Sequence, residues 1–479
     1  MKRYDLVVLG GGTAGLVAAH GAAGIGARVL LAERDRTGGD CLWTGCVPSK
    51  ALIESARLVH EMRHAEELGL APVEPEVDLA RVMERLREAQ QTIAPHDSPE
   101  RLRDAGVDVR LEAARFVSPG VVEVGGARVA YRTALVATGS SPALPPIDGL
   151  DRADPLTSDT VWDLRELPPR LAVLGGGPVG CELAQAFARL GSQVTLVEML
   201  PRLLAREEPR ASELVHDRLA AEGVTTLLGS TATAVRPSAA GGTLVVEKDG
   251  EEELVGFDRL LVAVGRTPST AGLGLDTVGV QTDNDGHVVV DDRMATTGAR
   301  IFAAGDVCGG PAFTHVAAYE AGLVVTNALF HLRRSADYER VPWVTFTDPE
   351  VARIGLTEAQ AHDRYGDDAI VTQFDHAEVD RAVTAARTSG FTKLVADPKG
   401  RIVGATIVSP GAGESIAEVT AWMNQGGTID DVGQTVHAYP TFSLGLQRAA
   451  GEHLRTKWFS PKVRAFTRPL LGLLRLVER

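Results

Sequence analysis

The sequence predicts an α/β protein that contains two copies of one strand–helix–strand unit. The first copy is YDLVVLGGGTAGLVAAHGAAGIGARVLLAE (4–33), and the second is RLAVLGGGPVGCELAQAFARLGSQVTLVE (170–198). In each copy an apolar strand enters a glycine-rich turn, a helix follows, and a second apolar strand closes on LLAE or TLVE. A repeat of this kind indicates two related domains, and a chain of 479 residues is too long for one hydrophobic core.

Three glycines and one glutamate keep the same spacing in both copies. The matched residues are Gly10, Gly12, Gly15 and Glu33 in the first copy and Gly175, Gly177, Gly180 and Glu198 in the second. The first glycine of such a motif permits a tight turn, the second lets a pyrophosphate reach backbone N–H groups, and the third lets helix and strand pack closely. A carboxylate at the end of the second strand accepts hydrogen bonds from ribose hydroxyls. The repeat therefore predicts two Rossmann-like dinucleotide-binding domains, although one such motif alone would be weak evidence.

Two further apolar strands end in a glycine-containing segment. They are ALVATGSSP (134–142), with Thr138 and Gly139, and LLVAVGRTP (260–268), with Gly265. Ligands bind at the carboxyl edge of open α/β sheets, so these residues are candidates for contact with the two nucleotides. Two nucleotide sites in one chain suggest one bound and one exchanging cofactor.

Two of the four cysteines, Cys41 and Cys46, lie in GGDCLWTGCVPSK (38–50). No metal site is predicted, because zinc needs three or four ligands and no paired Cys or His set stands nearby. A static disulfide is poorly motivated in the reducing cytoplasm that the low cysteine content suggests, so a redox-active pair is favoured. Lys50 and the start of a helix could lower the thiol pKa. Cys181 and Cys308 are expected to be packing residues.

Composition and charge exclude several classes of function. The formal net charge of −14 disfavours binding to nucleic acid. The N-terminus MKRYDLVVLGGG is predicted to be a strand and not a signal peptide, and no apolar stretch reaches the ~18 residues of a membrane span. These features predict a cytoplasmic globular protein.

Together, the motifs resemble the flavoprotein disulfide reductases with two dinucleotide-binding domains. This family includes dihydrolipoamide dehydrogenase, glutathione reductase and mercuric reductase, and the resemblance runs from Tyr4 to about residue 450. It implies an FAD-dependent oxidoreductase in which the first glycine motif binds FAD and the second binds the nicotinamide dinucleotide. It also implies that Cys46 is the thiolate against the flavin, that Cys41 exchanges with substrate, and that Lys50 lies beside the flavin and pairs with Glu182.

The resemblance implies further cofactor contacts and a domain order. Asp306 in IFAAGDVCG would bind the ribityl chain, and other residues matched to FAD are Ala114, Thr138, Gly139 and Thr314, with Gly265 matched to NAD. The FAD-binding domain would comprise 1–150 and 270–340, around an NAD(P)-binding domain at 151–269. An α+β dimerisation domain at 341–455, which in the family completes the partner subunit's active site, implies a homodimer.

The C-terminal segment HAYPTFSLGL (437–446) departs from the disulfide-reducing pattern. Tyr439 stands in place of a proton-donating His, and Leu444 stands in place of the Glu that orients it. Free Tyr titrates near ~10 and His near ~6.5, so a Tyr is a poor general base at neutral pH. Mercuric reductases also carry a Tyr here, but they keep the Glu and end in a cysteine pair, so that resemblance is partial. His437 is expected to be structural.

The sequence allows several interpretations of the electron acceptor. The first is transfer from NADH through FAD and Cys41–Cys46 to a small disulfide or thiol-reactive acceptor. The alternatives are a mercuric reductase-like metal-ion reductase using Tyr439, a diaphorase that reduces quinones, and a docked subunit of a larger complex. NADH is expected to be preferred over NADPH, because the charge of Glu198 would repel a 2′-phosphate.

A basic tail at 456–479 ends the chain. RTKWFSPKVRAFTRPLLGLLRLVER (455–479) has seven basic residues against one acidic residue. It could bind a membrane surface or a partner, or pack across its own acidic dimer. The second interpretation is favoured here, because Pro461 and Pro469 are expected to break a long amphipathic helix.

Overall fold

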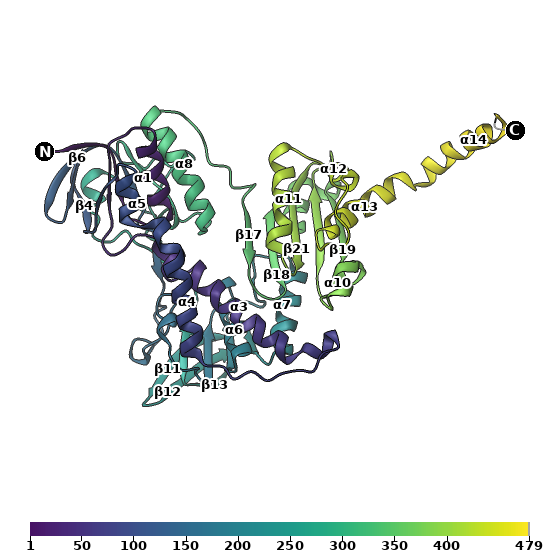
Figure 1. The fold of residues 1–479 in the computed structure, drawn as a ribbon, viewed down its shortest axis with the longest axis horizontal. Coiled ribbons are helices and arrows are strands. Elements are labelled where there is room, and N and C mark those ends of the chain that lie inside the picture. The colour runs from purple at the N-terminus through teal and green to yellow at the C-terminus, as the bar shows by residue number, and fades with distance from the viewer. Residues whose placement is uncertain (478–479) are drawn as a thin grey trace. The chain divides into compact units, whose positions relative to one another are not determined.

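The computed structural model describes residues 1–477, apart from the side chain of Lys462 (Figure 1). It divides into two compact units. Unit 1 comprises Met1–Met62, Glu74–Pro201 and Glu222–Asp337, and unit 2 comprises Arg63–Val73, Arg202–Ala221 and the chain from Tyr338 onward. The predicted α/β class is confirmed, since parallel sheets with helices fill unit 1 and an antiparallel sheet with helices fills unit 2.

The first sheet of unit 1 contains the N-terminal copy of the repeat. Its parallel part has the strand order β3-β2-β1-β6-β16, and β5 and β4 continue antiparallel from the start of β6. The strands are β1 (Arg3–Leu9), β2 (Val29–Ala32), β3 (Asp108–Arg110), β4 (Ala114–Ser118), β5 (Val121–Val124), β6 (Ala127–Val136) and β16 (Ile301–Ala303). Alternate residues of β1 pack on opposite faces, with Leu6 and Val8 in one core cluster and Val7 and Leu9 in the other.

Helices α1 (Thr13–Gly24) and α8 (Thr314–Phe330) lie side by side against this sheet (Figure 1). Their shared core cluster is rich in alanine, including Ala18 and Ala22 of α1 and Ala321 and Ala328 of α8. Small side chains let the two helices approach closely. This packing fixes the positions of the first turn of α1 and the first turn of α8.

The second sheet of unit 1 contains the other copy of the repeat. It is parallel, with the order β10-β9-β8-β14, and carries α6 (Pro178–Leu190) at the same place as α1 in the first copy. Its strands are β8 (Arg170–Leu174), β9 (Gln193–Glu198), β10 (Thr225–Leu228) and β14 (Arg259–Val262). Between β10 and β14 in the chain, β11 (Thr231–Ser238), β12 (Gly241–Lys248) and β13 (Glu251–Phe257) form a separate antiparallel sheet.

The two glycine-containing segments after β6 and β14 pair with each other. They form the antiparallel strands β7 (Ser140–Pro142) and β15 (Arg266–Pro268). The remaining helices of unit 1 are α2 (Gly39–Trp43), α3 (Cys46–Arg63), α4 (Leu79–Ile93) and α5 (Pro99–Asp104), with short 3₁₀ helices at Ala94–Asp97, Asp151–Ala153, Val161–Asp163, Asp276–Val278 and Asp306–Cys308.

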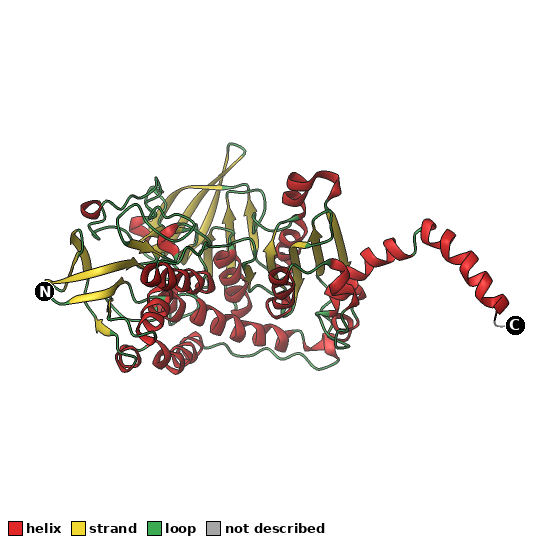
Figure 2. Cartoon of the chain, turned by 90° about the horizontal axis from the view of Figure 1, so that it is seen from above, coloured by secondary structure: helices red, strands yellow, loops and turns green. Residues whose placement is uncertain are grey.

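Unit 2 is built on one antiparallel sheet with the order β17-β18-β21-β20-β19. Its strands are β17 (Pro342–Thr345), β18 (Glu350–Gly355), β19 (Ile370–Asp375), β20 (Phe391–Ala396) and β21 (Ile402–Ser409). Its helices are α7 (Pro209–Ala221), α9 (Glu358–Tyr365), α10 (Asp380–Thr384), α11 (Ala412–Gln425), α12 (Ile429–Gln434), α13 (Leu444–Trp458) and α14 (Pro461–Val477), with 3₁₀ helices at Ala65–Leu68, Gly366–Asp368 and His376–Glu378. The core of this unit joins sheet residues such as Ile354 to α11, α12 and α13, and Figure 2 distinguishes its strands from these helices.

The expectation that Pro461 and Pro469 prevent a long amphipathic helix is wrong. Helix α14 is continuous over Pro461–Val477, with Pro469 inside it. Pro461 occupies the first helical position, where its missing N–H would have no intrahelical partner in any case. Pro469 removes one backbone donor, and the helix continues past it. No helix within residues 1–477 is long and apolar enough to cross a membrane.

Candidate functional site

The predicted redox cysteines lie at the junction of two helices. Cys41 is inside the short helix α2, and Cys46 is the first residue of α3. Both are free thiols, and the Cys46 Sγ lies 3.3 Å from the hydroxyl of Thr314, the first residue of α8. The start of a helix is the end at which its dipole favours negative charge, so this position suits a thiolate.

The surroundings of the two sulfurs separate their pKa values. The hydrogen bond from the Cys41 thiol lowers the pKa of Cys46 to about 6, and the Thr314 hydroxyl and the Lys50 charge act in the same direction against desolvation. The pKa of Cys41 is raised far above its ordinary value, because Cys41 donates that hydrogen bond and is partly desolvated. In the reduced pair, therefore, Cys46 is the thiolate and Cys41 is the thiol at neutral pH.

Lys50 lies one helical turn after Cys46 and pairs with Glu182. The Lys50 Nζ donates to the Glu182 Oε2 across 2.8 Å, and the Glu182 side chain is buried in α6. This ion pair joins the redox helix to the second glycine-motif helix. The Lys50–Glu182 ion pair therefore links the two copies of the repeat close to the cysteine pair.

The two glycine motifs have the same geometry. A Cβ at Gly10 would lie 2.2 Å from the Ala137 carbonyl oxygen, and one at Gly175 would lie 2.5 Å from the Ala263 carbonyl oxygen. The φ angles of these two residues are +108° and +110°, which also favour glycine. At Gly15 and Gly180 a Cβ would lie 1.9 Å from the carbonyl oxygen of the first glycine, so only glycine lets each helix pack this closely.

The middle glycines meet the requirement for a bound pyrophosphate. A Cβ at Gly177 would meet nothing within 4 Å, and one at Gly12 would meet only a backbone carbon at 3.8 Å. Each residue is an N-cap without a side-chain cap, and neither described helix has an acidic residue in its first turn. The N–H groups in the first turn of α1, and those that follow Pro178 in the first turn of α6, can therefore bind an anion, and the residues present fit a dinucleotide at each motif.

Glu33 and Glu198 are held in equivalent positions. The Glu33 Oε2 accepts from the Gly11 N–H at 2.6 Å, and the Glu198 Oε2 accepts from the Gly176 N–H at 2.6 Å. The second carboxylate oxygens accept from the backbone N–H groups of Asp35 and Leu200. Each carboxylate therefore stands at its motif with a fixed orientation and retains lone pairs for ribose hydroxyls.

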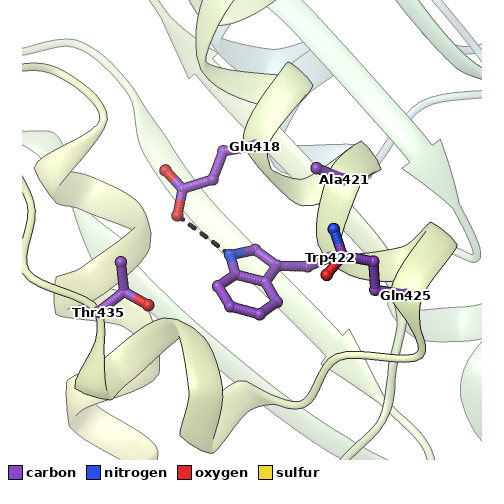
Figure 3. A pocket seen from close by; sticks show the side chains of 5 residues that line it. All are labelled: Glu418, Ala421, Trp422, Gln425 and Thr435. Atoms are coloured by element: carbon purple, nitrogen blue, oxygen red, sulfur yellow. Dashed lines mark hydrogen bonds between the residues drawn. The ribbon is translucent and has the colours of Figure 1, made fainter.

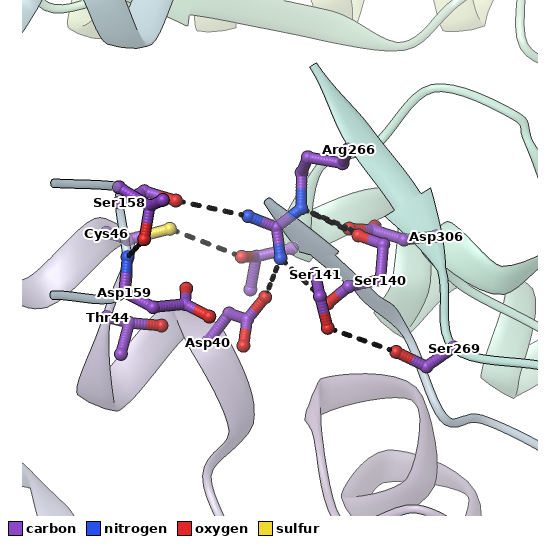
Figure 4. A network of polar contacts seen from close by, with 12 residues as sticks. Asp40, Thr44, Cys46, Ser140, Ser141, Ser158, Asp159, Arg266, Ser269 and Asp306 are labelled. Atoms are coloured by element: carbon purple, nitrogen blue, oxygen red, sulfur yellow. Dashed lines mark hydrogen bonds and ion pairs between the residues drawn. The ribbon is translucent and has the colours of Figure 1, made fainter. Parts of the chain in front are cut away.

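Asp306 belongs to a polar network that the sequence interpretation did not include. Arg266 pairs with both Asp40 and Asp306, and it donates from its Nε to the Ser140 hydroxyl at 2.6 Å (Figure 4). The Ser140 hydroxyl donates in turn to the Asp306 Oδ2 at 2.7 Å. Arg266 thus connects Asp40, in α2 next to Cys41, to the predicted ribityl-binding carboxylate of Asp306. The one feature of the sequence that could have pointed to Arg266 is its position directly after Gly265 in LLVAVGRTP.

The other predicted cofactor residues lie around the same strand ends. The Thr138 hydroxyl donates to the Ser269 carbonyl oxygen at 2.8 Å, and the Ser269 N–H donates to the Gly139 carbonyl oxygen at 2.9 Å. Gly265 accepts from the Ala143 N–H at the start of the β7–β15 pair. Ala114 is farther away in the sheet order and begins the edge strand β4.

Cys181 and Cys308 are held as neutral thiols. Burial raises the pKa of each thiol well above its ordinary value. The Cys181 Sγ donates to the Gly176 carbonyl oxygen at 3.3 Å.

One group of described residues, Asp283, Asp285 and His287, has possible metal-ligand atoms within 4.8 Å of one another. Asp283 caps its own turn by accepting from the backbone N–H groups of Asp285 and His287, so a structural role accounts for this acidic group.

In unit 2, Tyr439 is exposed and makes a hydrogen bond with a carboxylate. Its hydroxyl donates to the Asp380 Oδ2 at 2.7 Å, and this bond raises the pKa of Tyr439 above the ordinary value of a phenol. The side chain is 68% exposed, so the phenol is available to a molecule outside this unit. Leu444 is buried at the start of α13 and orients no polar group.

His437 has a carboxylate partner that the sequence interpretation missed. Its Nε2 lies 2.9 Å from the Glu418 Oε1, and its Nδ1 lies 3.0 Å from the Thr435 carbonyl oxygen. Glu418 also accepts from the Trp422 indole N–H at 3.3 Å, and these side chains line a hollow of about 270 Å³ (Figure 3). Glu418 lies on α11 at a position with no motif, so no sequence signal could have paired it with His437.

Unit 1 thus combines two dinucleotide-binding folds with a cysteine pair, and together these features fit a redox enzyme with two nucleotide cofactors. Comparison with known proteins identifies the family. Residues 4–321 match the pyridine nucleotide-disulphide oxidoreductase family, and residues 341–450 match the dimerisation domain of the same family. The chain belongs to this family of FAD-dependent oxidoreductases, which use NAD(P)H, and the dimerisation domain supports a homodimer.

Curated relatives carry two different names. A mercuric reductase of Lysinibacillus sphaericus is 38% identical over 448 residues, which cover 93% of this chain and 82% of that protein. A mercuric reductase of Streptomyces lividans is 38% identical, with 93% and 95% covered. A dihydrolipoyl dehydrogenase of Thermus scotoductus is 37% identical over 473 residues, with 94% and 97% covered.

Solved structures share the fold over nearly the whole chain. The Cu(II) complex of the HOCl-induced flavoprotein disulfide reductase RclA of Escherichia coli has a TM-score of 0.84 at 29% identity, covering 94% of this chain and 100% of that one. LpdA of Mycobacterium tuberculosis has a TM-score of 0.86 at 28% identity, covering 95% and 100%.

Proposed function

We propose that the protein is a homodimeric reductase of a thiol-bound soft metal ion, with Hg(II) as the representative acceptor. Electrons enter from NADH and reach the acceptor through the Cys41–Cys46 pair. Bound FAD supplies the two-electron carrier between the nicotinamide and the cysteine pair. The observation that carries the proposal is the state of Tyr439, an exposed phenol whose pKa is raised by its hydrogen bond to Asp380.

The cofactor roles of this chain's residues are part of the proposal. Backbone amides at the starts of α1 and α6 bind the two pyrophosphates, and Glu33 and Glu198 accept from the ribose hydroxyls. Thr138, Gly139, Asp306 and Thr314 lie along the first cofactor, Ala114 contacts its adenine, and Gly265 lies along the second. Lys50, held by Glu182, lies beside the FAD and keeps its charge close to Cys46.

The cysteine pair provides one ready thiolate. Cys46 is ionised at neutral pH because its pKa is about 6, and Cys41 holds its proton. Ligand exchange at a soft metal ion replaces one metal–thiolate bond by another, and the displaced sulfur leaves as a thiolate. Such an exchange does not depend on a protein group that protonates the leaving sulfur, whereas opening a disulfide gains ~10² to 10⁴-fold from a positioned acid.

Tyr439 fits the metal-ion reaction better than the disulfide reaction. A phenol with a raised pKa keeps its proton at neutral pH and so serves as a hydrogen-bond donor or weak oxygen ligand, not as a base. The names of the relatives support this interpretation, since several at 36–38% identity are mercuric reductases and one structural neighbour is a Cu(II) complex.

The test is anaerobic NADH oxidation by the FAD-loaded protein, with Hg(II) bound to excess small thiol and, separately, with lipoamide and other small disulfides. We expect turnover with Hg(II) that Cys41→Ser and Cys46→Ser each abolish. Turnover with an added quinone that survives Cys46→Ser, without turnover of Hg(II) or disulfides, would instead identify a diaphorase. Turnover only after a partner complex is added would favour a docked subunit.

Disulfide reduction is the second candidate, and the His437–Glu418 pair favours it. This pair contains the residue types of the missing acid–base dyad, and dihydrolipoyl dehydrogenases are among the relatives. Fast turnover of one disulfide, lost in His437→Gln and kept in Tyr439→Phe, would establish this candidate and reject the metal-ion proposal.

A further inference from the structure

Helix α14 has two chemically different sides. At 3.6 residues per turn, Arg464, Arg468 and Arg475 fall within a narrow sector of the helix. The opposite side, called here the apolar face, consists of Val463, Phe466, Leu470, Leu473, Leu474 and Val477. The spacing of these six positions follows i, i+3, i+7, i+10, i+11 and i+14, so the face is continuous along the helix.

The apolar face is open to solvent within unit 2. Phe466 is 75% exposed, Leu473 is 60% exposed and Val477 is 78% exposed. Trp458 and Phe459, at the junction of α13 and α14, are also more than half exposed. In the core of unit 2 the described part of α13 contributes Leu446, Ala449 and Ala450, whereas no described residue of α14 belongs to that cluster. An apolar surface of this length requires a partner.

Charge indicates which partner fits. The described part of α14 carries no acidic residue, although the whole chain has a formal net charge of −14. An acidic protein surface would attract the arginine side and leave the apolar face in water. An anionic bilayer satisfies both sides, because the acyl boundary takes the apolar face and the headgroups take the arginines. Trp458 and Phe459 lie just before α14, and aromatic residues at that position suit the same membrane–water interface.

We propose that α14 is an interfacial helix that docks the enzyme on an anionic lipid surface. The helix lies in the plane of the interface, with the apolar face toward the acyl chains and Arg464, Arg468 and Arg475 toward the headgroups. Binding is reversible, because one short amphipathic helix per subunit buries limited apolar area. Two tails in a homodimer would act together and raise the overall affinity.

The experiment is vesicle flotation of the full-length, FAD-loaded protein. We expect it to float with vesicles of phosphatidylcholine and phosphatidylglycerol in equal parts. Flotation with phosphatidylcholine alone should be much weaker, and added salt should reduce the bound fraction. Circular dichroism should show no loss of helix on binding, because the helix exists before it docks.

Matched leucine variants test the orientation of the helix. Leu470→Gln/Leu474→Gln alters the apolar face, and Leu471→Gln/Leu476→Gln makes the same chemical change off that face. The first variant should lose roughly tenfold or more in vesicle affinity, and the second should stay near wild type. Both should keep wild-type NADH oxidation in solution, which controls for folding.

Three outcomes would overturn the proposal. They are no flotation with anionic vesicles, equal loss in both leucine variants, or flotation unaffected by Arg464→Gln/Arg468→Gln/Arg475→Gln. If the first occurs and Leu470→Gln/Leu474→Gln instead dissociates the dimer in sedimentation, the tail packs on a second copy of the chain.

Discussion

At the scale of single residues, one hydroxyl helps decide which sulfur is ionised. Thr314 donates to the Cys46 Sγ, and its hydrogen bond is the strongest favourable effect on that thiolate after the bond from Cys41. A hydrogen bond to a charged group contributes about 1.5–3 kcal/mol, and one pKa unit corresponds to about 1.4 kcal/mol. Thr314 should therefore shift the ionisation of Cys46 measurably.

We predict that Thr314→Val raises the pKa of Cys46 by roughly one unit, whereas Thr314→Ser, which keeps the hydroxyl, does not. Because the pKa of Cys46 is lowered, its thiolate is present at neutral pH and is lost as the pH falls through about 6. The measurement is the rate of alkylation of Cys46 against pH in the reduced protein, with the site identified by mass spectrometry. Equal midpoints for Val and Ser would mean that the Thr314 contact does not control the thiolate.

Glu198 carries a prediction about the nicotinamide. Its carboxylate is fixed by the Gly176 and Leu200 N–H groups at the end of β9, where it would meet a 2′-phosphate. We predict that wild type favours NADH and that Glu198→Gln, which removes the charge and keeps the shape, raises kcat/KM for NADPH relative to NADH by roughly tenfold. Steady-state kinetics with both nucleotides measure this ratio. A wild type that prefers NADPH would reject this role of Glu198.

Single residues also mark the limit of what the sequence could predict. Gly10 and Glu33 were predictable because a repeat fixes their spacing. Arg266, Asp40 and Glu418 were not, because their partners lie far along the chain and a pairing across such a distance leaves no periodic pattern.

At the scale of elements, the end of α2 and the residues that lead from it to Cys46 are held by side chains from other segments. The Gln90 amide on α4 donates to the Leu42 and Trp43 carbonyl oxygens at 3.0 and 2.8 Å, and the Trp162 indole donates to the Thr44 carbonyl oxygen at 2.9 Å. Each carbonyl between Cys41 and Gly45 therefore has an identified donor. Rigid support of this kind keeps the two sulfurs within reach of each other.

We predict that Gln90→Leu destabilises the protein by about 1–3 kcal/mol, since it leaves two partly buried carbonyls without their donor. It should also raise the pKa of Cys46, because the loop that positions the Cys41 thiol loosens. Gln91→Leu makes the same change at the exposed neighbour on α4 and is the matched control. Denaturant unfolding and the alkylation profile provide the two measurements. A normal profile in Gln90→Leu would limit Gln90 to stability.

Elements with strong local patterns were predictable, and those governed by packing were not. The strands and helices of the two repeat copies follow from apolar runs and glycine turns. Helix α14 was predicted wrongly, because two prolines were taken to outweigh an amphipathic pattern that continues on both sides of Pro469. Pro461 stands at the first helical position, where its missing N–H has no effect on the helix. Pro469 removes one backbone N–H donor inside the helix, and the amphipathic pattern continues past it.

At the scale of the whole molecule, the α/β class and the family followed from the sequence. The homodimer followed only from the resemblance, and the match to a dimerisation domain now supports it. The electron acceptor did not follow, because in our proposal it depends on Tyr439, an exposed side chain whose neighbours in the assembled dimer cannot be read from the sequence. A dimer therefore offers the experiment that places Tyr439 in the reaction.

One inactive and one impaired variant should complement each other in a heterodimer if the partner subunit's Tyr439 completes the site. We expect Cys46→Ser to abolish Hg(II)-dependent NADH oxidation and Tyr439→Phe to lower it roughly tenfold or more. A heterodimer of the two has one site with intact cysteines and an intact partner Tyr439, and one site with neither. Random pairing after co-expression should therefore yield about a quarter of wild-type activity, and heterodimers isolated by two tags about half. If Tyr439 acts within its own subunit, both preparations should show only about half the activity of the Tyr439→Phe parent, since no subunit then has both groups and half of the subunits lack Cys46.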